Sequence, residues 1–163
     1  MSDTTPNPAP AYRIDEGSIT LPPAFQDRSN NIFVVADKLD TLPNLSIARD
    51  TLQAGEDIPA YVTRQVALLK RKMAGHKVEQ RAASWLGSGD EAIEGEAIQA
   101  HYRSGTTTVY QRQAAFALPS AAQPLRVLIF TASSPKPFIA AFDTLWQNWL
   151  ESFVPRRDGD DQP

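Results

Sequence analysis

Residues Tyr12–Pro22 read YRIDEGSITLP, and residues Phe25–Val34 read FQDRSNNIFV. The first stretch predicts a short strand, a tight turn at Glu16-Gly17 and a second strand that ends at Pro22-Pro23, because proline cannot donate to a strand ladder. The second stretch leads into a third strand. Its run Ile32–Val35 combines β-branched and aromatic side chains, so we expect this strand to be buried.

Farther along, the pattern predicts a first helix that Asp57 caps and that tolerates Pro59 in its first turn. We expect this helix to run to about Met73 and to end before Gly75. Its apolar side chains recur at helical spacing, which indicates one buried stripe: Ile58, Val62, Val66, Leu69 and Met73.

Four strands are predicted next, and we expect them to pair as consecutive hairpins: Lys77–Trp85, Ile93–Arg103, Thr107–Leu118 and Leu125–Thr131. A second helix should then begin with Ser134 as its cap and Pro135 in its first position. It carries a broad apolar face: Phe138, Phe142, Leu145, Trp146, Trp149 and Phe153. We expect Phe138, Phe142, Leu145 and Trp149 of this face to lie in the core. Trp146 alone could instead face a ligand or a dimer partner. The class is α+β, an antiparallel sheet of about six to seven strands flanked by two main helices.

Composition restricts the classes of function. The 163 residues suit one domain, which we place at 12–154 between disordered tails at 1–11 and 155–163. The net charge of −3 without a basic block argues against nucleic-acid binding. No apolar run is long enough for a membrane span, so we expect no direct membrane insertion. The start of the chain lacks the apolar core of a secretory signal, which favours a cytoplasmic location.

Catalytic chemistry has few candidate residues. The chain contains no cysteine and only two histidines, His76 and His101, which we expect at the surface. No common catalytic or phosphate-binding motif is present, so we predict neither enzyme activity nor a metal or other cofactor. Glu91, Glu94 and Glu96 gather near a turn, where a solvated hairpin edge explains them better than a cation site.

One sheet face is unusual because its side chains are small or polar. Asn44, Ser46 and Ala48 alternate with the apolar Leu45 and Ile47. Gln111 and Gln113 repeat this spacing in a later strand, and Gln65 interrupts the stripe of the first helix. Two interpretations stay open: a sheet face exposed to solvent, or a groove that receives apolar helices, since small residues and glutamines serve helix packing in membranes.

The stretches quoted first, together with Asn44–Asp50 (NLSIARD) and Trp149–Phe153 (WLESF), resemble the Eag family, the effector-associated chaperones of type VI secretion. The resemblance implies a PsbP/DcrB-like homodimer. It also implies a cytoplasmic partner: the N-terminal transmembrane helices of an effector, usually one that contains a PAAR domain. The implied helix-binding residues are Asn44, Ser46, Ala48, Gln65, Leu69, Gln111 and Gln113.

The chain departs from this family at Ala48, where a serine is common, so one hydrogen bond to the client helix is expected to be missing. The sequence leaves two alternatives to a chaperone. A non-enzymatic ligand-binding or assembly-factor module of the same fold is the alternative, and an enzyme comes third.

Overall fold

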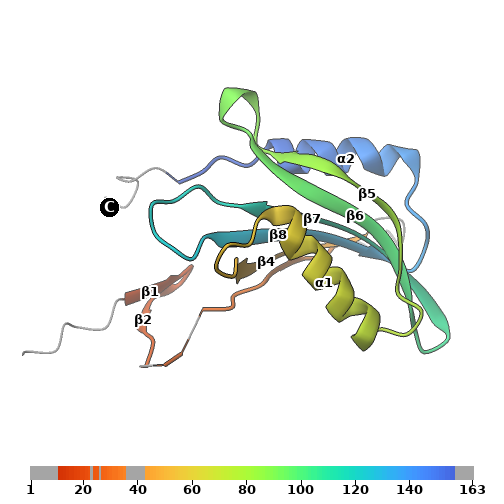
Figure 1. The fold of residues 1–163 in the computed structure, drawn as a ribbon, viewed down its shortest axis with the longest axis horizontal. Coiled ribbons are helices and arrows are strands. Elements are labelled where there is room, and N and C mark those ends of the chain that lie inside the picture. The colour runs from red at the N-terminus through yellow and green to blue at the C-terminus, as the bar shows by residue number, and fades with distance from the viewer. Residues whose placement is uncertain (1–10, 23, 26, 36–42, 157–163) are drawn as a thin grey trace, which may run out of the picture.

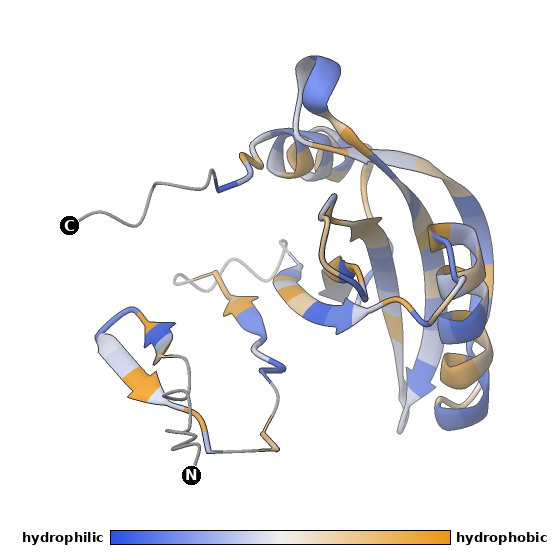
Figure 2. Cartoon of the chain, turned by 60° about the vertical axis from the view of Figure 1, so that its left-hand side comes forward, coloured by the Kyte–Doolittle hydropathy of each residue, from blue (hydrophilic) through white to orange (hydrophobic). Residues whose placement is uncertain are grey.

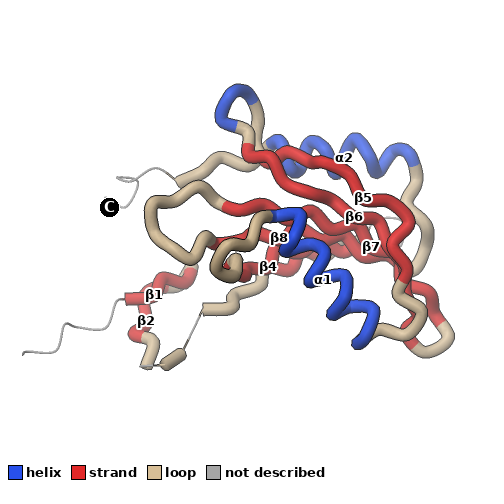
Figure 3. Tube along the Cα trace, viewed as in Figure 1, coloured by secondary structure: helices blue, strands red, loops and turns tan. Residues whose placement is uncertain are grey.

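The computed structural model describes residues 11–22, 24–25, 27–35 and 43–156. Within them the chain forms two sheets and two main helices (Figures 1 and 3). The strands are β1 (Ala11–Ile14), β2 (Gly17–Thr20), β3 (Asn31–Phe33), β4 (Asn44–Thr51), β5 (Lys77–Leu86), β6 (Ile93–Ser104), β7 (Thr107–Ala117) and β8 (Arg126–Ser134). The helices are α1 (Ile58–Lys72), the short 3-10 helix η1 (Gly89–Glu91) and α2 (Ala140–Glu151).

Six strands form the main sheet in the order β3-β4-β8-β7-β6-β5, and all neighbouring pairs are antiparallel. The predicted hairpins of β5 to β8 are therefore confirmed. Between β6 and β7 the turn passes through Gly105, whose φ of +62° is a left-handed conformation that glycine adopts without a steric penalty. The α+β class predicted from the sequence is confirmed.

Each main helix covers a different face of this sheet. Helix α2 packs on a cluster that includes Phe116, Phe130 and Leu86, all nearly inaccessible to solvent. On the opposite face α1 contributes Tyr61 and Val62 to a second cluster with Ile98 and Val127. Helix α1 contacts this face mainly at β6 and β7, and beside it the same face of β4 and β8 lines a groove.

Helix α1 begins and ends as its sequence predicts. The Asp57 carboxylate accepts the N–H of Ala60 at 2.9 Å, which satisfies one of the free donors of the first turn. Pro59 lies within that turn, and Met73 is the residue that caps the other end. Gly75 follows with a φ of +65°.

Helix α2 begins later than predicted. Ser134 is the last residue of β8, paired with Tyr110, and its hydroxyl accepts the N–H of Lys136 instead of capping the helix. The helix starts only at Ala140, because Pro135 and Pro137 disfavour helical backbone in the residues that precede them.

The suggestion that Trp146 faces a ligand or dimer partner is also wrong, since this residue of α2 is buried in the core between the helix and the sheet.

The N-terminal arm, residues 11–35, lies at the edge of the molecule. Figures 1 and 2 show the β1–β2 hairpin apart from the six-stranded sheet. Ala11, assigned to the tail from the sequence, is the first residue of β1. The remaining tail residues, 1–10 and 157–163, lie outside the described residues, and Pro155 and Arg156 form a loop.

Strand β3 corrects the expectation of a buried third strand. Ile32 is 67% exposed and Val34 is 68% exposed. The reason is topological: β3 is the edge strand, it pairs only with β4, and neither main helix lies over Ile32. Phe33 retains an edge-on contact with Trp149.

Candidate functional site

A groove of about 350 Å³ runs beside α1 over the sheet. Strands β4, β8, β7 and β6 of the sheet form its floor, and α1 forms its wall. Its lining residues are Asn30, Ser46, Ala48, Tyr61, Val62, Gln65, Leu69, Glu96, Ile98, Gln111, Gln113, Ala115, Ile129, Thr131 and Ser133. Small, hydroxyl and amide side chains dominate the floor. The apolar base of α1, where the helix meets the sheet, contributes Val62 and Leu69 to the lining.

Six of the seven residues that the sequence predicted for helix binding line this groove: Ser46, Ala48, Gln65, Leu69, Gln111 and Gln113. Asn44 does not line it. Asn44 lies on the same face, opposite Ser133 in the ladder, but at the exposed end of β4. The structure therefore brings together residues far apart in sequence, and their binding role stays a prediction.

Strand register explains why these residues meet. Successive side chains of a strand point to opposite faces, so Leu45 and Ile47 join the α2 core while Ser46 and Ala48 face the groove. The β4–β8–β7 ladder then aligns cross-strand rows on that face, of which Ser46–Thr131–Gln113 is the central one.

The row Ala48–Ile129–Ala115 lies beside this central row, nearer the apolar base of α1.

Several lining residues were missed by sequence reasoning. Thr131 and Ser133 alternate with the core residues Phe130 and Ala132, so the same two-residue period could have found them. Tyr61 and Asn30 carried no local signal, because only the packing of α1 on the sheet and the pairing of β3, which follows Asn30, with β4 bring them to the groove.

Glu96 also lies in the groove rather than on a solvated hairpin edge, and its side chain is only 13% exposed. Arg81 of β5 pairs with it through Nε. The other guanidinium nitrogens of Arg81 donate to the Thr63 hydroxyl at 2.9 Å and to the Pro59 carbonyl at 2.7 Å. Arg81 thus joins the β5 edge to α1 and balances the charge of Glu96. No group of three or more carboxylates and histidines arranged for a metal occurs among the described residues.

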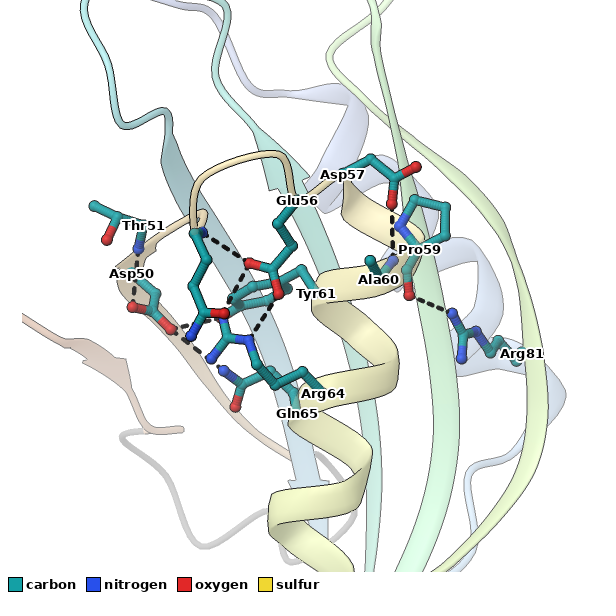
Figure 4. A network of polar contacts seen from close by, with 11 residues as sticks. Asp50, Thr51, Glu56, Asp57, Pro59, Ala60, Tyr61, Arg64, Gln65 and Arg81 are labelled. Carbon is teal, nitrogen blue, oxygen red and sulfur yellow. Dashed lines mark hydrogen bonds and ion pairs between the residues drawn. The ribbon is translucent and has the colours of Figure 1, made fainter.

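A second polar cluster lies where β4 meets α1 (Figure 4). The Asp50 Oδ2 atom accepts the Tyr61 hydroxyl at 2.9 Å and the Gln65 amide nitrogen at 3.4 Å. Asp50 Oδ1 accepts the N–H of Thr51 at 2.8 Å. Burial, together with the neighbouring Asp50 carboxylate, raises the pKa of Tyr61, so the phenol remains a donor at neutral pH.

The start of α1 is held by a two-pronged ion pair. Arg64 Nε and Nη2 donate to the two carboxylate oxygens of Glu56 at 2.7 and 3.0 Å (Figure 4). Hydrogen bonds from Arg64, and then from the N–H of Gln53, lower the pKa of Glu56. This pair fixes the loop before α1 and hence the groove wall.

The two histidines lie away from the groove. His76 is buried, which corrects the expected surface position, and neither ring nitrogen has a hydrogen-bond partner. Burial, followed by the charges of Lys70 and His101, lowers the pKa of His76. His101 lies 3.0 Å from the Glu79 carboxylate. Neither histidine is placed beside a groove hydroxyl.

Comparison with known proteins agrees with the fold. The DcrB family model matches residues 16–152, so this chain belongs to the DcrB family. The chain is 27% identical over 150 residues to a Pseudomonas aeruginosa protein named Effector EagT6, covering 89% of this chain and 95% of that protein. The Eag resemblance seen in the sequence is thereby confirmed.

A solved structure also has this architecture. The crystal structure of PA94, a protein of unknown function from P. aeruginosa, superposes with a TM-score of 0.66 at 23% identity. The match covers 91% of this chain and 98% of that one. In the described residues of our chain, neither helix has the length and apolar character needed to cross a membrane.

Proposed function

We propose that this protein is a type VI secretion chaperone that covers the N-terminal transmembrane helices of an effector, usually a PAAR-containing one, in the cytoplasm before export. One observation carries the proposal: six residues that the Eag resemblance associates with helix binding line a single groove. The similarity to EagT6 supports an effector as the partner.

The chemistry of the groove suits an apolar helix that carries occasional polar groups. Ser46, Ala48 and Ala115 have short side chains, which allow a helix backbone to approach the floor closely. Gln65, Gln111 and Gln113 can hydrogen-bond polar groups that would otherwise be buried without a partner. A transmembrane segment left in water would expose a large apolar surface and aggregate, so covering it before export is a physical need.

We propose that the working unit is a homodimer. Helix α1 has 15 residues and is therefore about 22 Å long, whereas a membrane-spanning helix is about 30 Å long. A second copy would extend the covered length. The arm supports this, because a two-stranded hairpin is marginal alone and Ile14 and Ile19 are each nearly half exposed. A second copy would shield these side chains.

No enzymatic activity is proposed. The groove lining contains neither histidine nor cysteine, and its two ionisable members, Tyr61 and Glu96, are engaged by Asp50 and Arg81. A groove built for holding fits a chaperone better than a site for proton transfer, which would need an acid or base free to reach the substrate.

Co-expression with a client fragment tests the proposal. The fragment is the N-terminal apolar region of a PAAR-containing type VI effector, and the matched control is the same effector without that region. We expect the chaperone to copurify with the first and not with the second. Equal recovery of both would refute binding to transmembrane helices, and recovery of neither would refute the effector partnership.

A further inference from the structure

Asp50, which lies outside the groove lining, determines which end of the Gln65 amide is free to bond in the groove. Gln65 Nε2 lies 3.4 Å from Asp50 Oδ2. A carboxylate only accepts hydrogen bonds, so the Gln65 amide must turn its NH₂ group toward Asp50. This contact settles the amide orientation by chemistry, and it leaves the carbonyl oxygen Oε1 of Gln65 without that partner, in a residue that lines the groove.

Asp50 is itself held firmly in this role. Its two oxygens accept three donors of the chain, from Thr51, Tyr61 and Gln65 (Figure 4). Tyr61 is only 2% exposed, so bulk water does not compete with Asp50 for the Tyr61 hydroxyl. Asp50 does not line the groove. It acts on the groove through Gln65.

Gln111 and Glu96 of the lining also present acceptor oxygens, whereas the hydroxyls of Ser46, Thr131 and Ser133 can donate as well as accept. Gln111 Nε2 donates to the Ser133 hydroxyl at 3.2 Å, and in this orientation the amide carbonyl oxygen of Gln111 does not bond to Ser133. Glu96 contributes a carboxylate whose partner, Arg81, directs its remaining nitrogens to α1. Gln65, Gln111 and Glu96 therefore all offer acceptors.

We propose that Asp50 is a positioning residue that makes the groove select client helices by their hydrogen-bond donors. Resting on the proposed function, this names the client chemistry: an apolar helix with a hydroxyl or amide N–H donor at the level of Gln65. An acceptor without a proton at that position meets the Gln65 oxygen and is disfavoured. An entirely apolar helix binds without a hydrogen bond to Gln65 and leaves the amide carbonyl unpaired.

Designed peptides test this selectivity. The parent probe is a 20-residue Leu/Ala helix with Lys pairs at both ends. A single serine is moved through seven successive positions, and each peptide is matched by one with O-methylserine, which keeps the oxygen but loses the donor. Binding to the whole protein is measured by fluorescence anisotropy. At the best position we expect the serine peptide to bind about threefold to thirtyfold more tightly, the range for a hydrogen bond between helices in an apolar setting.

Variants separate the positioning role from a structural one. Asp50→Asn frees the Gln65 amide to rotate, and Gln65→Met removes its acceptor, so both should reduce the preference to within about twofold while still binding the Leu/Ala parent. Gln65→Met also decides the matter if Asp50→Asn does not fold. The control Gln147→Met makes the same substitution at an exposed position of α2, on the other face of the sheet, and should keep the preference.

The outcomes are distinguishable. Equal binding of the two wild-type peptides at all seven positions overturns the selectivity while leaving the chaperone function standing. An undiminished preference in folded Gln65→Met assigns the selection to another residue and also overturns the inference. If the Leu/Ala parent does not bind at all, the proposed function fails, and the inference fails with it.

Discussion

Replacement of Ala48 by aspartate should strongly weaken client binding at pH 7 without unfolding the protein. Ala48 lies on the groove floor opposite Ile129, and the lining contains no lysine, arginine or histidine that could pair with a new carboxylate. Asp50 lies two residues along the same strand, about 7 Å away. Across an open, water-filled groove that like-charge pair costs only about 1 to 2 kcal/mol, so the free protein should stay folded.

A bound client changes the balance because it excludes water from the carboxylate. An unpaired charge in such a place neutralises itself by taking up a proton. A pH of 7 lies about three units above the pKa of an ordinary aspartate, and each unit adds about 1.4 kcal/mol to the free energy of protonating it. Protonation therefore limits the lost binding energy to about 4 kcal/mol, which is about a thousandfold in Kd.

This limit makes the defect depend on pH. At pH 5 the same aspartate is only about one unit above its ordinary pKa, so the penalty falls to about 1.5 kcal/mol. We expect the loss of affinity to shrink from about a thousandfold at pH 7 to about tenfold at pH 5. Anisotropy with a labelled client helix measures both values, and circular dichroism confirms that the variant is folded at each pH.

Asn44→Asp is the matched control. It adds the same charge to the same face of β4, but outside the groove lining. Its affinity should stay within about threefold of the wild type at both pH values. If folded Ala48→Asp binds the client as tightly as Asn44→Asp at pH 7, the client occupies another surface and the groove assignment is refuted.

Three further predictions concern assembly and stability. Light scattering should find a species of about 36 kDa, twice the 17.9 kDa chain, and combined Ile14→Ser and Ile19→Ser should shift it toward the monomer; a wild type at monomer mass at micromolar concentration would contradict the dimer. Stability to urea should fall from pH 7.5 to pH 5.5, because burial holds the pKa of His76 below its unfolded value of about 6.5 and protons then bind the unfolded chain preferentially; His76→Gln should weaken this slope, and an unchanged slope would exclude His76 as its source. Phe116→Ala should cost about 3 to 5 kcal/mol and lower Tm by about 10 °C, since Phe116 is fully buried between the sheet and α2, whereas the exposed Phe25→Ala should change Tm little.

Local signals in the sequence determined much of this protein. The two-residue period of Asn44–Ala48, the cap at Asp57 and the turn at Gly105 each act within a few residues, so β4, α1 and the β6–β7 hairpin were predictable. The same alternation placed Ser46 and Ala48 on one face. The Eag resemblance then brought Gln65 and Gln111 to that face, and the structure agrees.

Contacts between distant segments were decided only by the tertiary structure. The edge position of β3 leaves Ile32 in solvent despite its strand-forming sequence. The packing of α2 on the sheet buries Trp146. The acceptor groups of the groove depend on Asp50 meeting Gln65 across 15 residues of chain, and on Arg81 meeting Glu96 across another 15. No local pattern encodes such pairs, because hydrophobic periodicity reports which face a side chain takes, whereas its partner depends on strand order and helix placement.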